Sequence, residues 1–364
     1  MRVLIAPDSF SGTLSARAAA AAIAVGWRRR RPDDVVDVLP VADGGLGTVD
    51  VLAHLGETRA TSVEDALGRR VEAAWLRLGD TAVVESAAAC GRHLLDAPDV
   101  LRASTSGVGE LVCAALADGV RRVVVGVGNT ASCDGGAGLA QALGAWLLDA
   151  AGHPLDPGGA ALARLASVAL DDLDPRLRAV EVVAACDVDA GLCGPEGAAF
   201  GYGPQKGATP EDAALLDAAL RHYAAVSGGD AGAAGAGAGG GLGYGLATFA
   251  GATLARGAEV VLDLLSLRKR VPRADLVVTG EGAFDWQSLR GKAPVAVARA
   301  AADEGVPCVV VAGQVEVGRR ELAAHGVDAA YALADAAGSA DDAMADAEAW
   351  LTEVASSVAG EWSR

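Results

Sequence analysis

The sequence Leu276–Val277–Val278–Thr279–Gly280–Glu281–Gly282–Ala283–Phe284–Asp285 joins a short apolar run to a loop in which glycines surround two carboxylates. Three further apolar runs end in the same kind of loop: Val38–Val41 before Ala42–Asp43–Gly44–Gly45, Val123–Val125 before Gly126–Gly136, and Val182–Ala185 before Cys186–Asp187–Val188–Asp189. We interpret each run as a strand and each loop as its continuation at the carboxyl end, where ligands bind in open α/β sheets. The pattern predicts an α/β fold with a ligand site in these loops.

The composition of the loops indicates phosphate and metal chemistry. Glycine lets backbone N–H groups approach an anion closely, and carboxylates suit Mg²⁺, which often bridges protein oxygens to substrate phosphates. Glycine and aspartate are also ordinary turn residues, which would explain a single such loop. Because the pattern occurs repeatedly, we favour a phosphate and metal site. Its candidate residues are Asp43, Gly44, Gly45, Asp134, Gly135, Gly136, Asp187, Asp189, Gly280, Glu281, Gly282 and Asp285.

Composition excludes several classes of protein. The chain has 364 residues and a formal net charge of −17 at pH 7, which disfavours nucleic acid, since its binding needs clustered Lys and Arg. No apolar run approaches the roughly 20 residues that span a bilayer. The first strand, Val3–Ala6, ends at Pro7–Asp8, too soon for a signal peptide. We therefore expect a cytoplasmic protein without a membrane partner. The six cysteines contain no Cys-x-x-Cys pair, which argues against zinc or a disulfide framework.

Lysine usage points to two particular residues. Of the 30 basic residues only three are lysine, and two of these, Lys206 and Lys292, stand in glycine-flanked segments. The third is Lys269. An ammonium group is a compact point charge suited to phosphate oxygens, so we predict that Lys206 and Lys292 belong to the site. Chance surface lysines are the simpler alternative.

The order of segments predicts two domains. Both ends of the chain alternate strands and helices, whereas the middle begins with a hairpin, Val71–Leu78 and Thr81–Ser86. We expect a Rossmann-like α/β domain made of residues 1–70 and 260–364, with a second α/β domain, residues 71–259, inserted. Further helices are expected at Leu14–Trp27, Gly138–Leu148 and Asp341–Ala359. Composition alone makes the Gly/Ala-rich stretch Ser227–Gly245 a flexible linker.

Common nucleotide motifs do not explain the loops. Gly126–Ala131 fits the dinucleotide pattern G-x-G-x-x-A after a strand, but the following residues continue as a loop instead of opening a helix. No Walker A sequence occurs, because Trp286 takes the place of its first glycine. The five histidines share no motif.

Taken in order, the segments resemble the type-1 glycerate kinase family over nearly the whole chain. The matching stretches are Ala6–Pro7–Asp8–Ser9–Phe10, Ala42–Asp43–Gly44–Gly45, Asp134–Gly135–Gly136–Ala137–Gly138, Cys186–Asp187–Val188, Leu192–Cys193–Gly194–Pro195, Phe200–Gly207, Gly235–Gly243, Thr279–Gly280–Glu281–Gly282, Asp285, Gln287 and Gly291–Lys292–Ala293–Pro294. The resemblance implies a two-domain kinase without a Walker A loop. It adds Asp8 and Ser9 to the candidate binding residues and makes Gly235–Gly243 a site loop instead of a linker.

Three positions depart from the family pattern. Ser11, Leu46 and Ala283 stand where the family has lysine, glutamate and arginine. Since a buried charge without its partner is costly, the three family charges are interpreted as one interacting cluster that this chain has lost.

The resemblance implies an ATP- and Mg²⁺-dependent kinase of glycerate or a similar small hydroxy acid. Phosphoryl transfer depends on positioning and charge neutralisation. By chemical inference Asp187 and Asp189 would hold the metal or orient the attacking hydroxyl, and Lys206 and Lys292 would neutralise phosphate. The alternative is a catalytically impaired relative that binds nucleotide or metabolite without turnover. Oligomeric state and the hydroxyl that is phosphorylated stay open.

Overall fold

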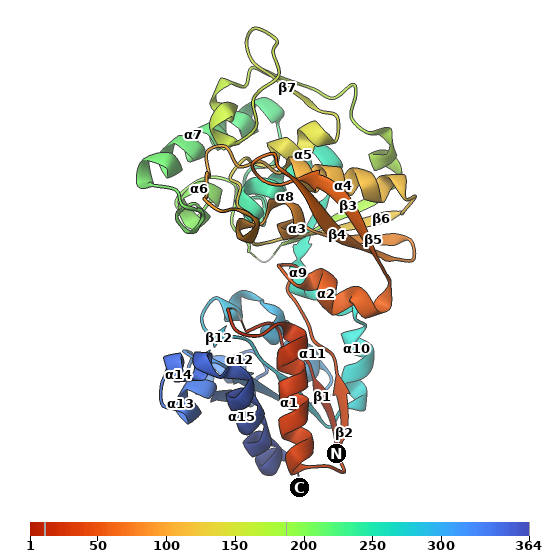
Figure 1. Cartoon of the computed structure of the whole chain (residues 1–364), viewed down its shortest axis with the longest axis vertical. Coiled ribbons are helices and arrows are strands. Elements are labelled where there is room, and N and C mark those ends of the chain that lie inside the picture. The colour runs from red at the N-terminus through yellow and green to blue at the C-terminus, as the bar shows by residue number, and fades with distance from the viewer. Residues whose placement is uncertain (11, 187, 364) are drawn as a thin grey trace. The chain divides into compact units, whose positions relative to one another are not determined.

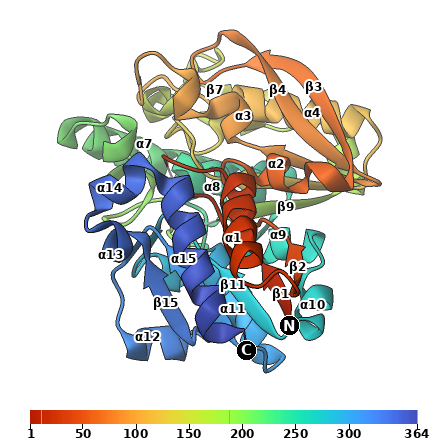
Figure 2. The same cartoon turned by 60° about the horizontal axis from the view of Figure 1, so that its bottom comes forward.

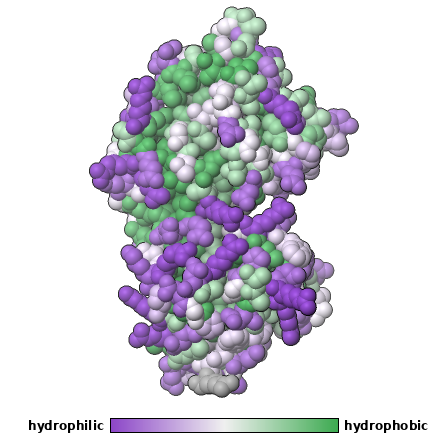
Figure 3. Space-filling model, turned by 180° about the vertical axis from the view of Figure 1, so that it is seen from behind, coloured by the Kyte–Doolittle hydropathy of each residue, from purple (hydrophilic) through white to green (hydrophobic). Residues whose placement is uncertain are grey.

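The computed structural model describes residues 1–10, 12–186 and 188–363. It divides into two compact units (Figure 1), unit 1 being Met1–Asp43 with Ala258–Arg364, and unit 2 being Gly44–Gly257. In the described part of the chain, no helix has the length and apolar character needed to cross a membrane. On the face shown in Figure 3, hydrophilic and apolar residues are interspersed over both units.

Unit 1 is built on a parallel sheet with the strand order β15–β13–β11–β1–β2. Its strands are β1 (Arg2–Ile5), β2 (Val35–Val38), β11 (Leu276–Thr279), β13 (Cys308–Ala312) and β15 (Ala329–Ala332), and β12 (Ala283–Phe284) pairs separately with β14 (Gln314–Val315). Its helices are α1 (Ala16–Arg30), α9 (Gly257–Leu264), α10 (Leu267–Arg270), α11 (Ala293–Asp303), α12 (Arg319–Ala324), α13 (Leu333–Ala337), α14 (Ala340–Ala345) and α15 (Ala347–Trp362).

The α/β class is thus confirmed, and the strand order specifies its variant. Counted along unit 1 the order is 2-1-3-4-5, the flavodoxin-like form of the doubly wound fold. In this form the order reverses between β1 and β11, and ligands bind beyond the strand ends at that point.

Helices α1 and α15 pack together over one face of this sheet (Figure 2). Trp27 and Leu351 from the two helices share a core with Val3 and Val278 from the strands. Ser15 caps α1 by accepting a hydrogen bond from the Ala18 N–H. At the contact between the helices, a Cβ on Gly26 would lie 2.1 Å from the Thr352 carbonyl oxygen.

Unit 2 is a mixed sheet of order β10–β9–β6–β5–β4–β3, parallel from β10 to β5 and antiparallel through β4 and β3. Its strands are β3 (Glu57–Glu64), β4 (Arg70–Leu78), β5 (Thr81–Glu85), β6 (Arg122–Val127), β9 (Glu181–Cys186) and β10 (Thr253–Arg256), with β7 (Trp146–Leu148) and β8 (Ser167–Ala169) forming a separate ribbon. Its helices are α2 (Thr48–Leu52), α3 (Ala87–Cys90), α4 (Ser106–Ala117), α5 (Ala137–Ala142), α6 (Ala198–Tyr202), α7 (Pro210–Ser227) and α8 (Ala238–Ala250).

Two apolar layers stabilise unit 2. In the first, Leu111 of α4 and Leu242 of α8 pack on the β6 residues Val123 and Val125. The second lies among the helices and contains Leu220 and Tyr223 of α7 with Tyr244 of α8.

Several sequence predictions need correction. A boundary near residue 70 would separate β3 from β4, but these strands pair as one hairpin, so the first boundary falls between Asp43 and Gly44. The helix expected to reach Leu148 ends at Ala142, because Gly144 takes a φ of +101° and the chain continues into β7. The closing helix is divided at Asp346 into α14 and α15.

The Gly/Ala-rich stretch is also not a linker. Its core starts α8, and Leu242 and Tyr244 within it are fully buried. Gly239, Gly240 and Gly241 have positive φ values of 60°, 73° and 90°, which disfavour any residue with a Cβ.

Two tyrosines in the helix layer of unit 2 should respond oppositely to loss of the hydroxyl. The Tyr223 Oη is buried and has no hydrogen-bond partner among the described residues, whereas the Tyr244 hydroxyl bonds Ser227 Oγ at 2.6 Å and the Gly229 N–H at 3.1 Å. We expect Tyr223→Phe to leave the free energy of unfolding unchanged or raise it by about 1 kcal/mol, and Tyr244→Phe to lower it by about 1–2 kcal/mol. Urea unfolding of both variants measures the difference, and a larger loss in Tyr223→Phe would contradict it.

Candidate active site

Three loops of unit 1 lie side by side at the switch point of its sheet. Backbone pairing continues beyond the strand ends, with the Asp8 N–H donating to the Gly280 carbonyl at 2.8 Å and the Val41 N–H donating to the Pro7 carbonyl at 2.9 Å. Asp8 therefore stands between the loop that carries Asp43 and the loop that carries Glu281. The sequence predicted these three residues from separate motifs, and the parallel sheet brings them together.

Burial and neighbouring carboxylates raise the pKa of Asp8 and of Glu281. Desolvation raises the pKa of Asp8 well above its ordinary value, and the neighbouring Asp43 and Glu281 raise it further. Glu281 is only 6% exposed, and burial raises its pKa to about 7, against the opposing charge of Lys292. The Lys292 Nζ lies 3.7 Å from Glu281 Oε2, while Glu281 Oε1 is buried without a hydrogen-bond partner among the described residues. These loops hold three carboxyl groups beside one ammonium group, and a bound cation would reduce the repulsion between the carboxylates.

The loop from Gly280 to Lys292 is shaped by its own residues. A Cβ on Gly280 would lie 1.9 Å from the Val311 carbonyl oxygen, so only glycine fits there. Gly282 is held through its carbonyl, which accepts the Gln314 N–H at 3.0 Å. Asp285 Oδ1 accepts the N–H groups of Gln287 and Ser288 at 2.7 and 3.0 Å, so this carboxylate supports the turn.

In unit 2, Asp134 is fully buried and holds the central glycine loop. Its Oδ2 accepts the N–H and the Oγ1 hydroxyl of Thr105 at 2.8 and 2.9 Å and the Gly138 N–H at 3.1 Å, and its Oδ1 accepts the Gly136 N–H at 3.2 Å. Burial raises the pKa of Asp134, and these hydrogen bonds oppose the rise. Asp134 therefore ties Gly135 and Gly136 to the start of α4. The sequence did not single out Thr105, whose only signal is its place in the polar run Ser104–Ser106 before a helix.

Lys206 is another buried charged residue of unit 2. Only 5% of the residue is exposed, and its Nζ donates to Thr130 Oγ1 at 3.0 Å and to the Ser132 carbonyl at 2.6 Å. A Cβ on Gly240 would lie 2.8 Å from this ammonium. The ammonium is thus fixed directly behind the left-handed glycines that open α8. Consecutive backbone N–H groups in such conformations form concave anion sites.

The loop at Gly44 and Gly45 begins unit 2 and is also closely packed. Gly44 has a φ of +95°. A Cβ on Gly126 would lie only 2.1 Å from the Gly44 carbonyl oxygen, so a side chain at position 126 would clash with this loop. Gly45 accepts the Thr48 hydroxyl at 2.8 Å. Glu85, which sequence reasoning missed, is 7% exposed and accepts the Val49 N–H at 2.7 Å, fixing the start of α2. Burial raises its pKa.

The remaining predicted residues have other local contacts, are exposed, or fall outside the described residues. Asp189 is exposed and pairs with Arg256, at 3.6 Å. Ser9 donates its N–H to Asp8 Oδ1 at 2.6 Å. Asp187 and Ser11 lie outside the described ranges. Leu46 is 50% exposed, and Ala283 is also exposed.

The acidic loops offer few ligands for a metal ion within the described residues. No group of three or more His, Cys, Asp or Glu side chains in the described ranges is arranged to hold an ion by itself. Mg²⁺ commonly uses only one or two carboxylates together with waters and substrate phosphates. Glu281 Oε1, which has no hydrogen-bond partner among the residues described, and its acidic neighbours therefore fit Mg²⁺ that arrives with a phosphorylated substrate.

Comparison with known proteins shows the family to which the chain belongs. The model of the glycerate kinase family matches residues 3–363. The chain is 42% identical over 370 residues to a glycerate kinase of Bacillus subtilis (strain 168), covering 99% of this chain and 97% of the relative, and 39% identical over 360 residues to a glycerate 2-kinase of Escherichia coli (strain K12), covering 94% and 93%. A crystal structure of a Salmonella typhimurium LT2 protein assigned as glycerate kinase 2 superimposes with a TM-score of 0.83 at 41% identity, over 99% of this chain and 98% of that one. The chain therefore belongs to the glycerate kinase family of enzymes.

Proposed function

We propose that this chain is an ATP-dependent kinase that phosphorylates a hydroxyl group of glycerate or of a closely similar small hydroxy acid. The observation that carries the proposal is similarity to glycerate kinases over essentially the full length, with the glycine and carboxylate loops at the predicted strand ends. The name of the Escherichia coli relative favours the 2-hydroxyl as the acceptor.

The residues of unit 2 suit a phosphate cradle. Lys206 is already desolvated and held by two oxygens, so it needs little reorganisation to stabilise charge on a phosphoryl group. The glycines at Gly135–Gly136 and Gly239–Gly241 present backbone without side chains. Asp134 would act by holding this loop in place, not by contact with the ligand.

The residues of unit 1 suit a cation and a second phosphate contact. Mg²⁺, when bound, would neutralise phosphate oxygens and withdraw charge from the transferred group. Asp8, Asp43 and Glu281 offer oxygens at the switch point, and Lys292 offers a positive charge beside them. Asp187 and Asp189 are retained as candidates for the metal or for orienting the attacking hydroxyl; of these, Asp189 must exchange its pairing with Arg256.

The catalytically impaired alternative is not favoured. Its motivation is the loss of charge at Ser11, Leu46 and Ala283. The two lysines and the acidic loops are nevertheless present, and the relatives that match along the full chain are named as kinases. Altered acceptor affinity is the more economical consequence of the three neutral residues.

Turnover of the purified protein tests the proposal directly. With ATP, Mg²⁺ and D-glycerate, we expect ADP release well above a blank without acid, and ³¹P NMR should show a phosphate ester on the 2-hydroxyl. A panel of small hydroxy acids measured in parallel gives the acceptor preference. Nucleotide binding without acid-dependent ADP release would support the impaired alternative instead.

The lysines provide a matched mutational test. We expect Lys206→Met and Lys292→Met each to lower kcat/KM by a factor of hundreds, because a preorganised charge at the transition state contributes roughly 3–4 kcal/mol. Lys269→Met removes the remaining lysine, which is exposed, and should leave kcat/KM unchanged. Thermal unfolding of each variant separates lost catalysis from lost folding. Near-normal turnover in the Lys206 or Lys292 variant would remove that residue from the site.

The Glu281 carboxyl should make the stability of the ligand-free protein depend on pH. Its pKa is about 7 in the fold against an ordinary value of 4.5, so the protonated form stabilises the fold. This contribution is complete below about pH 4.5 and is lost as the pH rises through 7, an upper limit on the order of 3 kcal/mol. In Glu281→Gln the free energy of unfolding should vary less between pH 5 and about 8. Exposed Glu304→Gln serves as the control, and equal pH profiles for all three proteins would contradict the expectation.

A further inference from the structure

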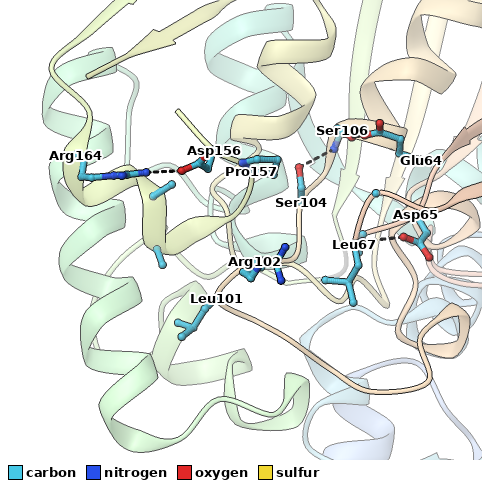
Figure 4. Close-up of a pocket in the computed structure, with 14 residues that line it drawn as sticks. Glu64, Asp65, Leu67, Leu101, Arg102, Ser104, Ser106, Asp156, Pro157 and Arg164 are labelled. Carbon is cyan, nitrogen blue, oxygen red and sulfur yellow. Dashed lines mark hydrogen bonds and ion pairs between the residues drawn. The ribbon is translucent and has the colours of Figure 1, made fainter. Parts of the chain in front are cut away.

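Unit 2 contains a pocket that none of the proposed kinase chemistry uses (Figure 4). Its volume is about 520 Å³, within the usual range for small-molecule sites. Three segments line it: residues 64–68 at the end of β3, residues 101–106 before α4, and residues 156–164. All three belong to unit 2, and none carries a predicted site residue.

Much of the wall is apolar, and its acidic groups are already engaged. Leu67, Leu101, Pro157 and alanines form the apolar part. Asp65 accepts the Leu67 N–H and the side chain of Arg69, and Glu64 accepts the Ser106 hydroxyl at 2.7 Å. Asp156 pairs with Arg164 at 2.8 Å.

The side chain of Arg102 is the exception. It lies between Leu67 and Leu101, near Ser104 (Figure 4), and makes no hydrogen bond or ion pair with any residue that the structure describes. A guanidinium carries a planar set of donors that matches a carboxylate in a bidentate geometry. Arg102 is exposed to solvent at the pocket, whose lining also includes charged residues of both signs. In a chain with a net charge of −17, its guanidinium is available to a carboxylate that enters the pocket.

We propose that this pocket is an effector site for a small organic acid. The ligand carboxylate would bind Arg102, and its apolar body would lie against Leu67, Leu101 and Pro157. A bare inorganic anion would leave this apolar wall uncovered, so an organic body is the better fit.

The pocket shares a segment with the central glycine loop. Ser104 and Ser106 line it, while Thr105 between them donates twice to Asp134. Asp134 in turn holds the N–H groups of Gly136 and Gly138. A ligand that orders residues 102–106 therefore acts on the loop through one buried carboxylate. Coupling of this kind typically changes affinity at the second site by about 5- to 150-fold.

Binding can be tested with probes that share one apolar body. Benzoate, benzamide and benzylamine would be titrated by calorimetry into the full chain with D-glycerate and ADP in excess, so that the kinase site is filled. We expect benzoate to bind and the neutral and cationic analogues to bind at least about tenfold more weakly, since a charge-assisted hydrogen bond contributes about 1.5–3 kcal/mol. Arg102→Gln should weaken benzoate about ten- to hundredfold, and Arg102→Lys less.

The control is Arg178→Gln, which removes another exposed arginine of unit 2 outside the pocket and should leave benzoate binding unchanged. Arg102→Gln should retain the basal kinase rate, since Arg102 has no place in the proposed site. If benzoate does not bind, or binds equally to Arg102→Gln, the pocket is not an organic-acid site.

The effector role has a readout that does not need kinase activity. Benzoate should change amide hydrogen exchange at residues 134–140 in the wild type and not in Arg102→Gln, because Asp134 holds two amides of this segment. Binding at Arg102 without any change in this exchange would overturn the effector role. Failure of the kinase assay leaves both of these measurements interpretable.

Discussion

The pairing of β1 with β11 is the contact on which the candidate site depends. It joins residues such as Ile5 and Val278, which are 273 positions apart. Just beyond them, the Thr279 hydroxyl reinforces the contact by donating to the Ala6 carbonyl at 2.7 Å. The register places Asp8 beside Gly280, and β2 on the other side brings the loop that ends at Asp43. A slip of this register would separate the three acidic side chains. The effect of Asp43 and Glu281 on the pKa of Asp8 is therefore a property of the sheet, not of any one loop.

The two units stabilise their polar groups differently. In unit 2 the Asp134 carboxylate and the Lys206 ammonium are buried with close hydrogen-bond partners, which fixes the glycine loops before any ligand arrives. In unit 1 Glu281 is buried, its Oε1 has no hydrogen-bond partner in the part of the chain that the structure describes, and the Lys292 ammonium lies 3.7 Å from its other oxygen. The polar groups of unit 2 are thus already held in place, whereas among the described residues of unit 1 a buried carboxylate oxygen is left for a ligand to bind.

Local signals in the sequence were sufficient for several central strands, because short apolar runs bounded by glycine and aspartate are typical of buried strands that end in loops. They located β1, β6, β9 and β11 and the helix α1. The predicted domain boundary was wrong because β3 consists mostly of polar residues and was not recognised as a strand that pairs with β4. Composition alone predicted a flexible linker at the glycine-rich start of α8, and this was wrong because the segment is ordered by tertiary packing against the loop at Ser132–Gly135. Thr105 and Glu85 were missed because their roles arise only when distant loops meet.

The insertion of unit 2 between β2 and β11 determines the order in which the protein can fold during synthesis. Residues 44–257 are continuous and can fold once they leave the ribosome, whereas β1 and β2 need β11, which begins at Leu276. The edge of β1 that will pair with β11 therefore stays unpaired while more than half of the chain is synthesised. Domains generally fold as units, the earlier ones first. Here unit 1 begins the chain but cannot fold until its second segment, Ala258–Arg364, has been synthesised. Truncation near the carboxyl terminus should for this reason leave the middle of the protein folded and its beginning exposed to proteases.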